Sequence, residues 1–512
     1  MTLVPVELTK GHISPESPSS ERTSVDSTRD RWRLAPLGLV VVLAVVLLLH
    51  AAPWITAGFG ESHDGRNAAT WGLSSRALRE DPIGSRLGGY VGSDWQYANH
   101  PPLIIGETAL VETIAGEHRI VTRAPAWLGS LVALFLLCWL LLDAGLSPTA
   151  VAAGVVSTCG STMFLVYGTM LDTPITSFPF TLAILFAWQR AWQRRPWPIP
   201  IVVALSVLAA LAGWQSLVFV ALAAASLAYR AMRRERDWSQ PLAMGCAAFI
   251  GLVATLAWIR WVYGSFTPLL DKEESRTHGA GILTTMHLQL DLLWGLMPTA
   301  LIIGALGIAF VVCDPRVRAL FALGTIAVVG YALVFRGAAE MHDYWNYAAL
   351  VPLCVAATAG FDYLLRNVST SRRTLSAVAS LLVATCCLTI AATRPTSAQY
   401  SIERSIGTVA LAHIAQDLPH DNAGPALAYV SVDRALSPWI QYEIGQPGLA
   451  LHGLGDLERL ADEHPDFPVL VILANSNDSA QTHLRANAFA IEGSFALVPA
   501  SVLQHTQTPT AR

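Results

Sequence analysis

The stretch from Pro125 to Leu142 reads PAWLGSLVALFLLCWLLL and contains no charged side chain. A helix needs about 20 apolar residues to cross the hydrocarbon core of a bilayer, so a run of this kind predicts a transmembrane helix. Arg123 stands just before the run and Asp143 just after it, as expected where a chain leaves the lipid. The stretch therefore indicates a membrane protein.

The composition extends this prediction to the whole chain. Of its 512 residues, 53% are hydrophobic and 14% are charged, whereas soluble domains have about 25% charged residues. The formal net charge is −4, and no basic cluster indicates a nucleic-acid partner. The seven cysteines form neither a disulfide framework nor a metal-ligand spacing. Eleven apolar runs predict membrane spans, at 35–53, 125–142, 148–167, 173–189, 198–212, 214–229, 241–262, 293–313, 318–335, 345–364 and 374–393.

The connections between these runs predict the orientation, because Lys and Arg favour the cytoplasmic side of a membrane. With the N-terminus inside, all the arginine-rich short connections share that side, namely 190–195, 230–236, 316–318 and 366–373. The outer segments are then 54–124, 263–292, 336–344 and the chain after 394. We therefore expect a multi-pass protein of the plasma membrane with a cytoplasmic N-terminus and an outer C-terminus.

Three regions differ in character. Residues 1–33 are rich in Ser, Pro, Thr and Glu and predict a disordered cytoplasmic tail; a signal peptide at 31–57 is the alternative, disfavoured by the long polar segment ahead of it. Residues 34–394 predict an all-α transmembrane domain. Residues 395–512 predict a soluble extracytoplasmic α/β domain. Its expected elements are strands at 426–432 and 469–474 and helices at 403–417 and 454–463.

The first outer segment, 54–124, is unusually long, and long loops in compact folds often carry function. It opens with ESHDGR at 61–66. Residues 66–80 predict an amphipathic helix on the bilayer surface. The sequence HPPL at 100–103 then begins an apolar helix, 103–115, which is too short to span a membrane.

Ionisable side chains avoid the centres of the predicted spans and gather at the outer rim. This distribution argues against a secondary transporter, whose charged sites lie near the bilayer midplane. The rim residues that we take as site candidates are His63, Asp64, Arg66, Asp94, His100, Arg123, Asp172, Arg260, Lys272, Arg276, Arg336, His342 and Tyr344.

Several candidates stand in short motifs with a recognisable order. An acid in the first outer loop is followed by a surface helix, HPPL at 100–103, RAP at 123–125, LDTP at 171–174 and MHDYW at 341–345. This order resembles the GT-C type, polyprenyl-phosphate-sugar-dependent glycosyltransferases, which include the protein O-mannosyltransferases, the lipid A aminoarabinose transferases and the bacterial Rgt-like transferases. The resemblance covers residues 35–365. It departs from the family pattern in having Gly65 where a second acid often stands and Trp345 in place of a tyrosine.

The resemblance implies a GT-C-like fold and an enzyme that moves a sugar from a polyprenyl-phosphate donor to a lipid, glycan or protein acceptor at the outer face. We expect an inverting hexosyl- or pentosyltransferase of the bacterial cell envelope. The acceptor hydroxyl would attack the anomeric carbon while the polyprenyl phosphate departs, which requires a base near the hydroxyl and positive charge near the phosphate. Asp64 is the predicted base, and the other candidates are predicted to contact the donor or the sugar.

The main candidates also have purely structural explanations. Asp64 and Asp172 each precede a helical stretch and could cap it, in which case Asn would replace Asp64 with little loss of stability. His100 could fix the turn before two prolines. His342 and Tyr344 could be interfacial anchors.

The remaining cations are similarly ambiguous. The segment 271–276, with Lys272 and Arg276, is either a solvated loop or a mobile lid over the lipid phosphate. Arg260 stands between Trp258 and Trp261, which are typical interfacial anchors.

Two other functions compete with the enzyme, a lipid or polysaccharide transporter and a non-catalytic scaffold for the C-terminal domain. Convergence of Asp64, His100, Asp172 and His342 on one outer cavity would favour the enzyme, whereas a central polar pathway would favour transport. No cofactor is expected; Asp64, Asp94 and Asp172 leave a divalent metal open, but their spacing does not indicate one. The C-terminal domain is expected to contact the acceptor or the rim and not to carry the base.

Overall fold

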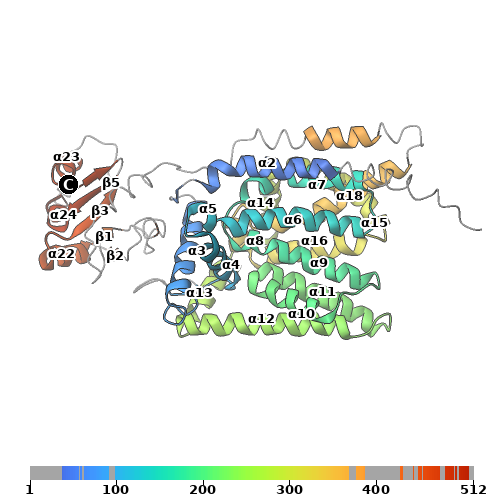
Figure 1. Ribbon diagram of the computed structural model, residues 1–512, viewed down its shortest axis with the longest axis horizontal. Coiled ribbons are helices and arrows are strands. Elements are labelled where there is room, and N and C mark those ends of the chain that lie inside the picture. Colours follow the sequence, from blue (N-terminus) through green and yellow to red (C-terminus); the bar gives the residue numbers. More distant parts are fainter. Residues whose placement is uncertain are drawn as a thin grey trace, which may run out of the picture.

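A computed structural model shows a mostly helical chain with one small sheet near its C-terminal end (Figure 1). The predicted tail at 1–33, the predicted helix at 403–417 and Asp94 lie outside the described residues. The structure describes residues 37–56, 58–59, 63–90, 98–367, 376–386, 427–430, 442, 448–451, 454–472, 479–488, 490–492 and 495–506.

Each of the eleven predicted spans contains a helix. Ten of these helices carry labels: α2 (Gly38–Ile55), α6 (Ala124–Asp143), α7 (Pro148–Cys159), α9 (Phe178–Trp192), α10 (Ile199–Ala212), α11 (Trp214–Met232), α12 (Ser239–Tyr263), α15 (Pro298–Cys313), α16 (Arg318–Val334) and α18 (Leu350–Asn367). The eleventh predicted span contains the apolar helix 376–386.

Four of the described helices are long and apolar enough to cross a membrane alone: α6, α11, α12 and the continuous helical segment Tyr347–Asn367. The pair α14 (Ile282–Leu296) and α15 forms a fifth candidate, with a bend of 114° between its halves. These helices make the chain a multi-pass membrane protein. The number of eleven crossings and the orientation remain predictions.

Small residues allow the helices to pack closely. A Cβ atom on Gly307 of α15 would lie only 2.0 Å from the backbone oxygen of Ala356 on α18. A Cβ on Gly251 of α12 would lie 2.5 Å from the Cβ of Ala210 on α10. Because van der Waals packing largely drives helix association in lipid, backbones that approach this closely are expected where glycine and alanine face each other.

Most of the segments predicted to be outer loops contribute helices to a layer across one end of this helical body. The layer contains α3 (His63–Glu80), α4 (Leu103–Ala115), α5 (Arg119–Thr122), α13 (Thr267–Thr277) and α17 (Arg336–Met341). In Figure 1, α3 and α4 lie across the ends of long helices such as α6 and α12.

The predicted surface helix at 66–80 is confirmed as a helix but differs from the expectation in its surroundings. It begins at His63, and most residues of its first three turns, from Asp64 to Ser75, are buried in protein. The reason is that α4 packs along it. Glu112 of α4 accepts hydrogen bonds from Ser75 of α3 and from Thr122 of α5, so the three helices form one unit.

The C-terminal part contains a five-stranded mixed sheet in the order β2-β1-β3-β5-β4. Strand β1 runs parallel to β2 and β3, and β5 runs antiparallel to β3 and β4. The predicted strand at 426–432 contains β1, the strand at 469–474 overlaps β3, and the helix at 454–463 coincides with α22. The elements are β1 (Leu427–Val430), β2 (Gly448–Leu451), α22 (Leu454–Glu463), β3 (Pro468–Ile472), α23 (Ser479–Ala486), β4 (Ala490–Glu492), β5 (Phe495–Pro499) and α24 (Ala500–Thr506).

A separate hydrophobic core holds this sheet and its helices together, with Leu457, Leu460, Val469, Val498 and Leu503 among its buried residues. Figure 1 shows the sheet as a lobe distinct from the helical body. Its assignment as an extracytoplasmic domain that begins at 395 remains a prediction.

Candidate active site

Three segments that are far apart in the sequence meet around the carboxylate of Asp172. Tyr344, in the segment after α17, donates its hydroxyl to Oδ2 of Asp172 at 2.6 Å. Nε2 of His63, at the start of α3, lies 2.6 Å from the same hydroxyl, and Asn67, one turn further along α3, donates from Nδ2 to Oδ2 of Asp172 at 3.0 Å. Three of the predicted site residues therefore form one hydrogen-bonded cluster.

Asp172 also caps the short helix α8 (Thr173–Thr176), as the sequence allowed. Its Oδ1 accepts from the backbone N–H of Thr173 at 2.6 Å. Capping and participation in the cluster are therefore compatible, since each uses a different oxygen of the carboxylate.

His100 links this cluster to α13. Its Nδ1 lies 3.3 Å from the hydroxyl oxygen of Thr173, and its Nε2 lies 3.2 Å from Nη2 of Arg276. The guanidinium can only donate, so Nε2 accepts and the ring carries its proton on Nδ1. Burial lowers the pKa of His100 well below its ordinary value, and the charge of Arg276 acts in the same direction. A neutral His100 at pH 7 fits both observations.

His342 stands beside the same cluster. Its ring centre lies 5.2 Å from that of His63 and 5.4 Å from that of Tyr344. Burial, reinforced by His63 and Arg276 and opposed by Asp172, lowers the pKa of His342 to about 4. Its buried Nδ1 has no hydrogen-bond partner within the described part of the chain. The ring is therefore neutral at pH 7 and able to bond to a ligand.

The predicted base, Asp64, forms a buried ion pair with Arg123. Nε and Nη2 of Arg123 donate to Oδ2 of Asp64 at 3.2 and 2.9 Å. Both side chains are 1% exposed, and the Arg123 guanidinium also lies over the ring of Phe59, 4.5 Å from its centre. The other carboxylate oxygen, Oδ1, is buried and has no hydrogen-bond partner among the residues that the structure describes.

The cations divide into two groups. Arg276 contacts the cluster through His100, and the backbone of Arg336 packs against Gly279 just beyond α13, with a buried Nε that has no partner in the described residues. Lys272 is exposed on α13, and Arg260 is exposed near the end of α12. The structure thus places Arg276 in contact with the cluster and Arg336 beside α13, and the charge of Lys272 helps to lower the pKa of His100. Among the described residues, no contact joins Arg260 to the cluster.

Arg66 is half-buried on α3, three residues after His63. Among the described residues, no group of three or more His, Cys, Asp or Glu side chains could hold a metal ion.

Several residues of the site were not predicted from the sequence. Asn67 follows His63 by four residues and shares its helix face, a spacing that could have drawn attention to it. Tyr167 donates its hydroxyl to Asp343 and lies 5.3 Å, ring centre to ring centre, from Tyr344. It ends a π-helical segment, Met163–Tyr167, and such segments are frequent at functional sites, but this geometry has no signal in the sequence.

The fold and this site together define a multi-pass membrane protein with an enclosed polar cluster at one end of its helices. Its fold is that of ArnT. The crystal structure of ArnT from Cupriavidus metallidurans bound to undecaprenyl phosphate matches with a TM-score of 0.59 and 14% identity, over 91% of this chain and 98% of that chain. The apo structure matches with a TM-score of 0.59 and 12% identity, over 94% and 100%. No family model and no curated protein matches the sequence.

Proposed function

We propose that this protein is a membrane glycosyltransferase that moves a sugar from a polyprenyl-phosphate donor to an acceptor at the outer face. The observation that carries the proposal is the convergence of His63, His100, Asp172, His342 and Tyr344 at one end of an ArnT-like fold. The undecaprenyl phosphate in one of the ArnT structures supports a polyprenyl phosphate as the leaving group.

The reaction is a single displacement at the anomeric carbon. The acceptor oxygen forms a bond to this carbon, the bond from the carbon to the phosphate oxygen breaks, and the polyprenyl phosphate leaves with the electron pair. The acceptor proton goes to a base. Because the displacement occurs in one step, the anomeric configuration inverts.

In this proposal Asp64 is the base. Arg123 occupies Oδ2 and leaves Oδ1 without a partner, whereas both oxygens of Asp172 already accept hydrogen bonds. Asp64 is therefore the better proton acceptor of the two.

The departing phosphate requires positive charge and hydrogen-bond donors. Arg276 and Arg336 supply permanent charge, and Arg can hold two phosphate oxygens at once. The neutral ring of His342, whose Nδ1 has no partner in the described part of the chain, can supply a hydrogen bond without a change of protonation. In this proposal Arg276 and Arg336 face the departing phosphate, and the base stands on α3.

The test uses purified protein in lipid nanodiscs with a panel of polyprenyl-phosphate sugars and membrane-extracted acceptors. Release of free polyprenyl phosphate, together with transfer of the sugar, is the expected result for one donor. Movement of an intact lipid between leaflets without cleavage of any donor would instead establish the transporter. Release of the phosphate by Asp64→Asn at the wild-type rate would reject Asp64 as the base while leaving the reaction class in place.

A further inference from the structure

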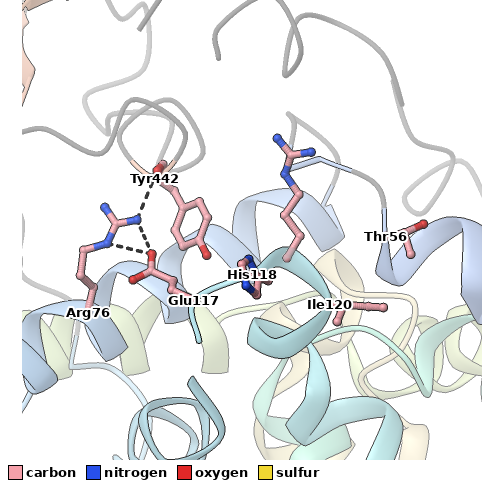
Figure 2. Close-up of a pocket in the computed structure, with 7 residues that line it drawn as sticks. Thr56, Arg76, Glu117, His118, Ile120 and Tyr442 are labelled. Carbon is pink, nitrogen blue, oxygen red and sulfur yellow. Dashed lines mark hydrogen bonds and ion pairs between the residues drawn. The ribbon is translucent and has the colours of Figure 1, made fainter. Parts of the chain in front are cut away.

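Tyr442, from the C-terminal part of the chain, lies buried against the outer layer of the helical body (Figure 2). Its ring meets that of Phe59 edge-on, with 4.5 Å between the ring centres. The guanidinium of Arg76 lies over the same ring, 4.8 Å from its centre, and donates to the Tyr442 carbonyl oxygen at 3.3 Å. The Tyr442 hydroxyl lies 3.0 Å from the hydroxyl of Thr122. Only 8% of the Tyr442 surface is exposed. We call the site that it fills, formed by Phe59, Arg76 and Thr122, the slot.

A glycine shapes this slot. A Cβ atom on Gly72 of α3 would lie 2.6 Å from Cε2 of Tyr442 and 3.1 Å from Cγ2 of Thr122. Both distances are shorter than ordinary van der Waals contact. The slot therefore accepts the tyrosine ring because residue 72 has no side chain.

The slot and the Asp64–Arg123 pair are connected through Phe59 and Thr122. Phe59 contacts Tyr442 through its ring and carries the Arg123 guanidinium over its face. Thr122, which bonds to the Tyr442 hydroxyl, is the residue before Arg123. Two short routes, one through Phe59 and one through Thr122, therefore connect Tyr442 to the side chain that holds Asp64.

The surroundings keep this contact in place. Glu117 binds both Arg76 and Arg79 of α3, as Figure 2 shows for Arg76. Tyr442 also forms one wall of an open cavity of about 520 Å³, whose other lining residues include Thr56, His118 and Ile120. The C-terminal part thus forms one wall of this cavity and also fills the slot.

We propose that Tyr442 is a positioning residue through which the C-terminal part controls sugar transfer. Its docking holds Phe59 and Thr122, which in turn fix Arg123 and the orientation of the Asp64 carboxylate. This inference rests on the proposed function, with Asp64 as the base. It makes the C-terminal part a requirement for the chemical step rather than for donor binding.

The test combines three variants with separate measurements of kcat and donor affinity. Tyr442→Ala empties the slot, and Gly72→Ala fills it from the opposite side. Alanine is a better helix former than glycine by about 1 kcal/mol, so a loss of activity in Gly72→Ala cannot come from a weakened α3. Tyr442→Phe keeps both ring contacts and loses only the hydroxyl.

We expect Tyr442→Ala and Gly72→Ala to lower kcat by about tenfold or more, since small misplacements of a reacting group are costly. Donor affinity should stay at the wild-type value, because Arg276, Arg336 and His342 are untouched. Tyr442→Phe should retain most of kcat. The double variant Tyr442→Ala/Gly72→Ala should be no slower than Tyr442→Ala alone, since both changes remove the same contact.

Wild-type kcat in both Tyr442→Ala and Gly72→Ala would overturn the inference, as would an equal loss in Tyr442→Phe and Tyr442→Ala. Hydrogen exchange of the backbone amides at 119–123 can be measured without turnover. The exchange rate should rise in Tyr442→Ala. If wild-type protein transferred no sugar, the proposed function would fail. Unchanged exchange in this segment would separately refute the docking role of Tyr442.

Discussion

Arg123 donates two hydrogen bonds to a single oxygen of Asp64, and neither side chain has more than 1% of its surface exposed. The Asp64 carboxylate therefore belongs to a buried ion pair and does not act as a cap for α3. Removal of one partner from a buried pair costs about 3–5 kcal/mol, because the other charge is left unpaired. If Asp64 were a helix cap, Asn would replace it with little loss of stability. The buried ion pair with Arg123 makes that outcome wrong.

Asp64→Asn is expected to lose both stability and activity. A positioned base commonly contributes about 10²–10⁴-fold to a rate, so sugar transfer should fall by at least about a hundredfold. The midpoint of thermal unfolding should also fall. Both quantities are measured on the same nanodisc preparation, with donor cleavage as the activity.

A double variant separates the two effects. In Asp64→Asn/Arg123→Gln no charge is left unpaired, so stability should recover in part while transfer stays low. Recovery of transfer together with stability would show that Asp64 acts only through folding. The base would then have to be sought elsewhere.

Tyr344→Phe tests the bond that joins α3 to Asp172. The hydroxyl donates to Asp172 and lies within hydrogen-bond distance of the half-buried His63, so its loss removes one of the two hydrogen bonds to Oδ2 of Asp172 and the contact with His63. Such a loss costs about 1–3 kcal/mol. We expect a lower unfolding midpoint and slower transfer. Tyr363→Phe is a matched control, because the Tyr363 ring is exposed near the C-terminal end of α18, where it stacks on Phe310; an equal effect of the two variants would contradict a specific role for Tyr344.

The pKa of His342 predicts loss of stability in acid. The pKa is about 4 in the folded protein and 6.5 in its ordinary state, so below pH 6.5 the unfolded chain takes up a proton that the folded chain does not. Stability should therefore fall as the pH drops from about 6.5 to about 4. Across this range the midpoint of thermal unfolding should depend less steeply on pH in His342→Gln than in wild type. An identical pH dependence in both proteins would show that His342 does not titrate in this way.

The cations near the cluster should govern donor affinity. Loss of a buried partner of a phosphate costs about 2–5 kcal/mol, so Arg336→Ala or Arg276→Ala should weaken binding by more than about tenfold if the residue touches the phosphate. Arg260→Ala serves as the comparison, because Arg260 is exposed near the end of α12. Equilibrium binding of a labelled polyprenyl phosphate measures all three. Equal affinities would remove Arg276 and Arg336 from the donor site.

The sequence predicted the helices better than their assembly. Apolar runs give helix positions because lipid requires every backbone group to be bonded within the segment, and all eleven runs contain helices. The runs do not indicate that α14 and α15 form a sharply bent pair or that α3 is enclosed by α4. Those features depend on contacts between segments distant in the chain.

The same limit applies to the site. His63, Asp172 and Tyr344 stood out as single polar residues at the rim, but their hydrogen bonds join positions that the sequence separates widely. The pairing of Asp64 with Arg123 was equally hidden, although both residues were candidates. Tyr442 lacked any signal, since one aromatic residue in a soluble domain is more often part of a core. Its role depends on Gly72, whose lack of a side chain has meaning only once α3 is folded.

Membrane topology is the last prediction, since the outer location of the site depends on it. Arg190 pairs with Asp143, and Arg316 pairs with Asp362. Asp143 ends α6, whose first residue follows α5 of the layer that holds α3, so the pair with Arg190 lies at the end of α6 away from that layer. Near the C-terminal end of α12, Trp258 donates to the backbone oxygen of Arg86 in the segment after α3, so this end of α12 lies beside that layer and its first residue, Ser239, lies away from it. Ser239 begins α12 and Ser275 lies on α13, and both are exposed, so they form a matched pair. After removal of the native thiols, a cysteine at Ser275 should react with a membrane-impermeant maleimide added to intact cells, while one at Ser239 should react only after lysis. Labelling of Ser239 in intact cells with protection of Ser275 would reverse the orientation and place the candidate active site in the cytoplasm.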